Sequence, residues 1–184
     1  MRTADVLRTA LAGVAVIGLA GGCGSTVGGT AATPTTTVRN LDEIEVYNPC
    51  TELGDEALRA TGIDPATKRV ITDPPQGPAS WRMCGWRAPD LPYTLQVGSS
   101  SHTPEETRSN PKVTVLNDVQ IGSRPGLISQ DKSDSKGLIC YVTFPAEQGM
   151  FEISVGWMSS QPITRDRCEL AVEHARDLEP ILPK

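Results

Sequence analysis

Hydrophobic and polar residues alternate through the middle of the chain, with the period of two that is typical of a half-buried β-strand. The clearest alternations occupy residues 93–97, 138–144 and 151–157. Weaker patterns predict further strands at 81–88, 113–116, 119–121 and 127–130. The residues between these runs favour turns: 122–126 is rich in glycine, serine and proline, and 145–149 fits a hairpin loop.

Helical spacing replaces this alternation near the start of the strand-rich region. Apolar or small residues recur at helical intervals after Cys50, and Gly62 is placed to close the helix in the left-handed conformation. Asp55 is expected to cap the second half of this helix. The recurring positions are Leu53, Ala57, Leu58 and Thr61.

A second helix is predicted at the end of the chain. Thr164 is the expected N-cap, and Pro180 is expected to end the helix because proline cannot continue it. One apolar stripe runs along this helix and consists of Cys168, Ala171, Val172, Ala175 and Leu178. The order helix, antiparallel strands, helix predicts an α+β fold: a twisted antiparallel β-sheet with an N-terminal and a C-terminal helix packed on one face.

The first residues have the pattern of a secretory signal peptide. Arg2 and Arg8 precede an apolar run over residues 10–20, and Gly21, Gly22 and Cys23 follow. The run is too short to cross a membrane comfortably, since a spanning helix needs about 20 apolar residues. The small residues before Cys23 resemble the bacterial lipobox, in which the cysteine receives diacylglycerol. Residues 1–22 are therefore predicted to be a lipoprotein signal peptide and Cys23 the lipidation site, although Ala20 stands where the lipobox prefers leucine.

Residues 23–43 are predicted to form a lipidated, flexible tether, because they are rich in threonine and glycine and contain little that could enter a core. Residues 44–184 are predicted to form a single extracytoplasmic domain. Removal of residues 1–22 takes away two arginines and one aspartate, so the formal charge changes from −5 to −6. An acidic chain has no excess of basic residues for a phosphate backbone, and we expect no nucleic-acid partner.

Four cysteines remain after Cys23: Cys50, Cys84, Cys140 and Cys168. An even number outside the cytoplasm favours two disulfides, and three pairings are open. We favour Cys50–Cys84 with Cys140–Cys168, because each would attach one predicted helix to the sheet. Their wide spacing, with no neighbouring cysteine or histidine, argues against a metal site or a redox pair, so no metal and no cofactor is predicted.

The only serines beside a histidine, Ser99–Ser101 next to His102, lack the GxSxG elbow of a hydrolase, and we expect a surface loop there. No catalytic residue is predicted. Trp81 and Met83 lie on the opposite strand face from Cys84, in a chain with 4% aromatic residues, and are the candidates for a ligand-facing apolar patch. Burial under a loop or terminus is the alternative for these residues, and it is the one that we favour.

Four different cysteine-containing motifs follow one another along the mature chain. They are Asn48-Pro49-Cys50 at the first helix, Cys84-Gly85-Trp86 on an early strand, Cys140-Tyr141-Val142 on a later strand and Cys168 in the last helix. With the lipobox and the threonine-rich tether, they resemble the actinobacterial lipoproteins of the domain-of-unknown-function 3558 (DUF3558) family. The resemblance implies a cell-envelope lipoprotein and implies no activity.

The expected function is therefore that of a lipid-anchored, non-enzymatic binding module on the extracytoplasmic face of the cell membrane. Its partners would be the membrane, reached through the lipid on Cys23, and an unidentified envelope protein or lipid. The alternative is a carrier of a lipid or another hydrophobic envelope molecule, with a pocket between the sheet and the helices.

Overall fold

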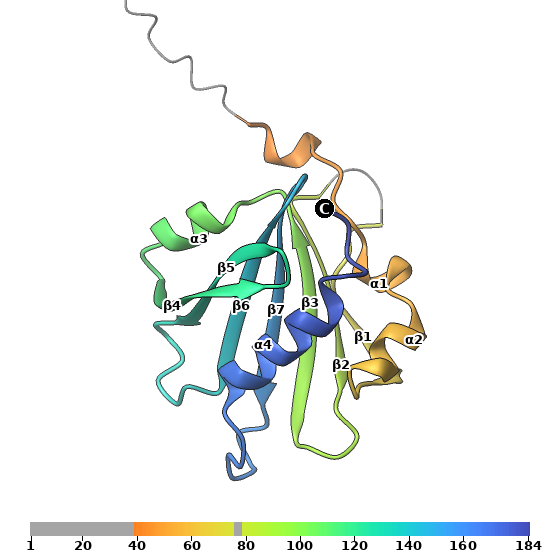
Figure 1. The fold of residues 1–184 in the computed structure, drawn as a ribbon, viewed down its shortest axis with the longest axis vertical. Coiled ribbons are helices and arrows are strands. Elements are labelled where there is room, and N and C mark those ends of the chain that lie inside the picture. Colours follow the sequence, from red (N-terminus) through yellow and green to blue (C-terminus); the bar gives the residue numbers. More distant parts are fainter. Residues whose placement is uncertain (1–38, 76–78) are drawn as a thin grey trace, which may run out of the picture. The chain divides into compact units, whose positions relative to one another are not determined.

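The computed structural model describes residues 39–75 and 79–184, and a seven-stranded antiparallel sheet is its main element (Figure 1). The strand order is β1-β2-β3-β7-β6-β5-β4, so β1 and β4 are the edges. The strands are β1 (Asp64–Thr72), β2 (Trp81–Arg87), β3 (Tyr93–Ser100), β4 (Val113–Ile121), β5 (Arg124–Asp131), β6 (Ile139–Ala146) and β7 (Gly149–Trp157).

Four α-helices and one 3-10 helix accompany the sheet in the described residues. They are η1 (Leu41–Glu43), α1 (Pro49–Glu52), α2 (Asp55–Ala60), α3 (Pro104–Ser109) and α4 (Arg167–Leu178). Figure 1 shows α4 crossing the sheet, and it packs on β6 and β7. The expected α+β class, with an antiparallel sheet and two disulfides, is confirmed.

The core lies against one face of the sheet. Trp86, Leu95, Val155 and Cys140 are paired in register across β2, β3, β7 and β6, and all are at most 1% exposed. Residues paired directly across neighbouring strands lie on the same face, so this row crosses the middle of one buried face. The alternation read from the sequence predicted this face correctly.

Each disulfide joins a helix to a strand. Cys50 of α1 is bonded to Cys84 of β2, and Cys168 of α4 is bonded to Cys140 of β6, which is the favoured pairing. Helix α3 contacts the opposite face, where the Thr107 hydroxyl lies 3.5 Å from the sulfur of Met150. We call the face that carries Cys84 and Cys140 the disulfide face, and the other the α3 face.

The helix ends differ from the prediction. The first predicted helix is interrupted at Leu53 and Gly54, because Leu53 is extended (φ −77°, ψ 112°). Gly54, not Asp55, is the N-cap of α2, whereas Gly62 has the expected positive φ of 78°. The predicted N-cap Thr164 is also wrong: Asp166 caps α4, because its carboxylate accepts hydrogen bonds from two backbone N–H groups.

Two predicted turns are present but shorter than expected, and the strands predicted at 113–116 and 119–121 are a single strand. Residues 113–121 form one strand with a bulge, and the turn predicted at 122–126 is limited to Gly122 and Ser123. Gly126 lies inside β5, where glycine is needed because a Cβ would be 2.6 Å from the Thr143 carbonyl oxygen. The hairpin loop predicted at 145–149 shortens to two residues, because β6 ends at Ala146 and β7 begins at Gly149.

Contacts with the sheet begin five residues before the expected domain start. The Arg39 guanidinium donates to the Gln148 carbonyl at 3.0 Å, and the Ser101 hydroxyl donates to the Leu41 carbonyl at 2.9 Å. Residues 1–22, Cys23 and the tether as far as residue 38 lie outside the described residues. No helix of the described part is long and apolar enough to cross a membrane.

Candidate functional site

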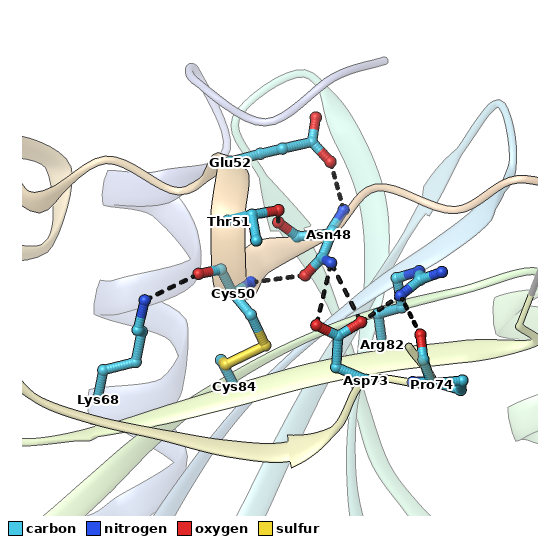
Figure 2. The surroundings of a disulfide bond; sticks show 9 residues. All are labelled: Asn48, Cys50, Thr51, Glu52, Lys68, Asp73, Pro74, Arg82 and Cys84. Carbon is cyan, nitrogen blue, oxygen red and sulfur yellow. Dashed lines mark hydrogen bonds and ion pairs between the residues drawn. A yellow bond between two sulfur atoms is a disulfide. The ribbon is translucent and has the colours of Figure 1, made fainter. Parts of the chain in front are cut away.

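The Asn48-Pro49-Cys50 motif holds the first disulfide in place (Figure 2). The Asn48 side-chain oxygen accepts the Cys50 backbone N–H at 2.9 Å and so caps α1. Glu52 closes the turn, because its Oε1 accepts the Asn48 backbone N–H at 2.6 Å. The Lys68 ammonium of β1 donates to the Cys50 carbonyl at 3.1 Å. The motif therefore connects α1 with both β1 and β2.

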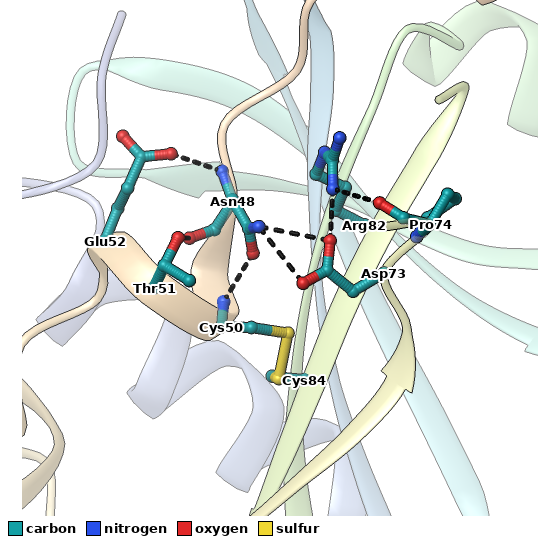
Figure 3. Close-up of polar contacts among 8 residues, drawn as sticks. All are labelled: Asn48, Cys50, Thr51, Glu52, Asp73, Pro74, Arg82 and Cys84. Atoms are coloured by element: carbon teal, nitrogen blue, oxygen red, sulfur yellow. Dashed lines mark hydrogen bonds and ion pairs between the residues drawn. A yellow bond between two sulfur atoms is a disulfide. The ribbon is translucent and has the colours of Figure 1, made fainter. Parts of the chain in front are cut away.

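Figure 3 shows that the Asn48 amide also points at a carboxylate after β1. Asn48 Nδ2 donates to the two carboxylate oxygens of Asp73 at 3.1 and 3.2 Å. Asp73 also pairs with the Arg82 guanidinium of β2, which donates in addition to the Pro74 carbonyl at 3.2 Å. These groups satisfy one another around the disulfide, and the cluster has a structural role.

A buried chain of hydrogen bonds joins α2, β3 and α4. The Thr61 hydroxyl donates to Asp177 at 2.7 Å, so its oxygen accepts from Nδ1–H of His174, also at 2.7 Å. Nε2 of His174 then carries no proton and accepts the hydroxyl of Tyr93 at 2.8 Å. Burial lowers the pKa of His174 to about 4, consistent with a neutral imidazole. Because both ring nitrogens are occupied, this chain is structural.

A large pocket lies between α3 and the strands β4, β5 and β6. We name it the α3 groove; its volume is about 770 Å³, within the range of small-ligand sites. Its apolar lining includes Pro104, Val119, Pro125, Leu127 and Pro145. Its charged lining consists of Arg39, Glu105, Arg108, Asp118 and Glu147.

Local sequence positions α3 as one wall of this groove. Thr103 and Glu106 form a capping box, in which the Thr103 hydroxyl accepts the Glu106 N–H and the Glu106 carboxylate accepts the Thr103 N–H. That backbone hydrogen bond is the main reason why the pKa of Glu106 is lowered. Pro104 occupies the first helical turn, where its missing N–H costs nothing. The short helix therefore has a fixed start.

An ion pair between Arg108 of α3 and Asp118 of β4 joins the helix to the edge strand, and Glu105 lies 3.7 Å from the same guanidinium. The charges are at the rim, since the side chains of Glu105 and Asp118 are 81% and 75% exposed. Leu127, by contrast, is 1% exposed. The groove therefore combines an apolar base with a polar rim, an arrangement that binds an apolar segment of a ligand and orients its polar end.

The two residues expected to face a ligand lie beside each other on the α3 face. A Cβ on Gly98 would be 3.0 Å from Met83 Cε and 3.3 Å from Trp81 Cζ3, so both side chains cover this glycine. The rings of Trp81 and His102 are 6.1 Å apart. Trp81 and Met83 are only partly buried, and neither of them lines the α3 groove.

The surface loop expected at Ser99–Ser101 is wrong. Ser99 and Ser100 belong to β3, and all three serines are fully buried. The Ser100 hydroxyl donates to the Ser80 carbonyl at 2.7 Å. The backbone of this segment packs closely against Gly149, where an added Cβ would lie 2.5 Å from the Ser100 carbonyl oxygen.

The α3 groove was not predicted from the sequence, although the sequence does indicate the helix that forms one of its walls. Thr103-Pro104-Glu105-Glu106 is a capping-box sequence, and the first-turn carboxylates indicate a short helix there. Nothing local connects that helix with Pro125 or Leu127. Within residues 39–75 and 79–184, no group of three His, Cys, Asp or Glu side chains is arranged to hold a metal ion.

One family comparison identifies the chain. The sequence model of the family described as "Protein of unknown function (DUF3558)" matches residues 18–180. The chain belongs to the DUF3558 family. The match includes all four disulfide cysteines of this DUF3558 protein and the whole lining of its α3 groove. Neither the curated proteins nor the solved structures contain a significant match to it.

Proposed function

We propose that this DUF3558 protein is a lipid-anchored lipoprotein of the actinobacterial cell envelope and acts as a non-enzymatic binding module. The α3 groove carries this proposal, because it is a pocket of about 770 Å³ with an apolar base and a charged rim. The two disulfides support export, since such bonds persist in oxidising compartments. The protein would lie at the extracytoplasmic face of the cell membrane.

Part of the proposal is that the N-terminal and C-terminal helices pack on one face of the sheet. The register supports it: Cys84 pairs with Val97, Val97 with Ile153, and Ile153 with Val142, which lies two residues from Cys140. The cysteines that bond α1 and α4 then share the disulfide face. A ligand would approach the opposite face, where α3 and the groove lie.

The lipid on Cys23 would join the domain close to the groove. Arg39, the first described residue, lines the groove and donates to the Gln148 carbonyl at 3.0 Å. Cys23 is only sixteen residues before Arg39 in the sequence. The groove would therefore meet ligands at or close to the membrane surface.

Replacement of the lipidated cysteine tests the anchor. Cys23→Ala removes the sulfur that would carry diacylglycerol, and two acyl chains are needed for stable attachment. We expect the variant to lose metabolically incorporated palmitate, and Cys50→Ala/Cys84→Ala to keep it. Incorporation of palmitate by Cys23→Ala at the wild-type level would contradict the lipoprotein assignment.

A carrier of a lipid or another hydrophobic envelope molecule is the second candidate. It is favoured by the apolar base of the groove, formed by Pro125, Leu127 and Pro145. A carrier and a protein-binding module differ in what occupies the groove, so the occupant has to be identified in place.

Site-specific photo-crosslinking in the full chain identifies the occupant. A benzophenone amino acid at Gln120, which lines the groove, should capture its ligand, and the same residue at Thr114 of the same strand is the control. An adduct of lipid mass specific to position 120 supports the carrier, and one of protein mass supports the binding module. Equal adducts at both positions, or none at position 120, would contradict the groove as a binding site.

A further inference from the structure

A second, smaller groove on the α3 face has a charge opposite to that of the chain. It has a volume of about 390 Å³ and lies over β1, β2 and β3. We name it the arginine groove, because Arg69 and Arg87 line it together with Lys68, Thr94 and Gln96. It shares no lining residue with the α3 groove.

The lining contains three cations and no carboxylate, although Asp and Glu outnumber Lys and Arg by 22 to 17 in the whole chain. The Lys68 ammonium donates to the Cys50 carbonyl of α1, so the two guanidinium groups are the cations open to the groove. Arg69 pairs with Gly85 in the register, and Arg87 is two residues from Gly85 on the same strand. The two arginines therefore flank a glycine on one face of the sheet. Gly85 has no side chain of its own, and the Ile71 and Gln96 side chains lie next to it: a Cβ there would be 3.2 Å from Ile71 Cδ1 and 3.5 Å from Gln96 Cγ.

The guanidinium groups of Arg69 and Arg87 have no partner in the part of the chain that the structure describes. Among residues 39–75 and 79–184, no side chain forms an ion pair or hydrogen bond with the side chain of Arg69 or Arg87. Asp64 is opposite Arg87 in the register, but its carboxylate accepts the Ala66 backbone N–H at 3.0 Å. The donors of both arginines are thus available to a ligand.

The remaining lining residues limit the kind of ligand. The Thr94 hydroxyl donates to the Gly156 carbonyl at 3.3 Å, whereas the Gln96 amide has no partner among the described residues. The two guanidinium groups supply only hydrogen-bond donors, and the Gln96 amide supplies both donors and an acceptor. Planar guanidinium groups bind phosphate oxygens in pairs, which adds geometric selectivity to charge.

We propose that the arginine groove binds a phosphate group, and that Arg69 and Arg87 hold its oxygens. The phosphate belongs either to a soluble phosphate ester or to a phospholipid headgroup, which present the same chemistry. This site is independent of the ligand in the α3 groove. Its affinity is expected to fall with ionic strength, because both arginines are exposed.

Calorimetric titration of the full chain in neutral detergent tests the site. One arm uses inorganic phosphate and the other uses dihexanoylphosphatidylglycerol below its critical micelle concentration. Saturable binding of inorganic phosphate indicates a soluble source, and binding of the lipid alone indicates a headgroup. No binding in either arm would overturn the proposal.

A charge-matched pair of double variants provides the control. Arg69→Gln/Arg87→Gln should weaken binding at least about tenfold. Lys112→Gln/Lys136→Gln removes the same charge from exposed positions outside the groove and should leave binding within about twofold of wild type. Equal loss in both double variants, or no loss in the arginine variant, would overturn the proposal. Gln120→Trp changes a residue that lines the α3 groove and not the arginine groove, so it should not change phosphate binding.

Discussion

Arg124 and Glu179 form an ion pair with both side chains only 6% exposed, and the Nε–Oε1 distance is 3.0 Å. The guanidinium also donates to the Leu182 and Pro145 carbonyls and lies 5.5 Å from the centre of the Phe144 ring. These contacts attach the C-terminal end of the chain to β5 and β6.

Removal of one partner from this pair should destabilise the domain strongly. Glu179→Gln leaves the Arg124 charge buried without its counter-ion, and such changes typically cost about 3 kcal/mol or more. Glu173→Gln is the control, because Glu173 pairs with Arg165 at the surface, where a loss below about 1 kcal/mol is expected. Urea unfolding measures both. Equal losses of unfolding free energy in the two variants would show that the buried ion pair stabilises the domain no more than the surface pair does.

Gly122 should be difficult to replace, for two separable reasons. Its φ is 53°, and an added Cβ would lie 2.2 Å from Oε2 of Glu179. Gly62→Ala is the matched control: its φ is 78°, but nothing lies within 4 Å of an added Cβ. Backbone strain alone predicts a loss of about 1 kcal/mol for Gly62→Ala, and Gly122→Ala should lose clearly more. Thermal unfolding with equal shifts of Tm would contradict this difference.

A buried histidine, His174, and a partly buried glutamate, Glu152, should give opposite slopes of stability against pH. The pKa of His174 falls from 6.5 to about 4, so the unfolded chain binds its proton first and stability decreases as pH falls from 6.5 to 4. Burial raises the pKa of Glu152 from 4.5 to about 7, so stability decreases as pH rises from 4.5 to 7. Between pH 4.5 and 6.5 the two contributions oppose each other.

Glu152→Gln should therefore reveal the slope due to His174. We expect its free energy of unfolding to rise by about 1 kcal/mol per pH unit, relative to wild type, as pH rises between 4.5 and 6.5. Glu45→Gln, at an exposed position, should keep the wild-type profile. Urea unfolding at five pH values in this window is sufficient. A Glu152→Gln profile parallel to that of wild type would contradict the burial of this carboxyl group.

The buried strands were predictable because their residues alternate. The pairs Trp86–Leu95 and Val155–Cys140 belong to long apolar–polar alternations and form the centre of the sheet. The edge strand β1 (Asp64–Thr72) gave no such signal, because most of its side chains are exposed and Val70 and Ile71 are consecutive. An edge strand exposed to solvent has no buried side to impose a period.

The α3 groove was not predictable, because its walls are far apart in the sequence. Thr103 and Glu106 indicate the start of α3, but the contact of that helix with β4 depends on the pair between Arg108 and Asp118. The burial of Arg124 was equally unpredictable from local sequence. It follows a turn, as many surface residues do, yet it is buried against Glu179. Contacts across the fold, not local pattern, determine both.

The central claim is that the α3 groove holds the ligand, and native mass spectrometry of the full chain purified from its own membranes tests it most directly. We expect wild type to carry one stoichiometric ligand. Gln120→Trp fills the groove and should lose this ligand, whereas Thr114→Trp, with the same side chain at an exposed position outside it, should keep it. Repeated absence of a ligand from wild type, or equal occupancy in Gln120→Trp, would contradict the account.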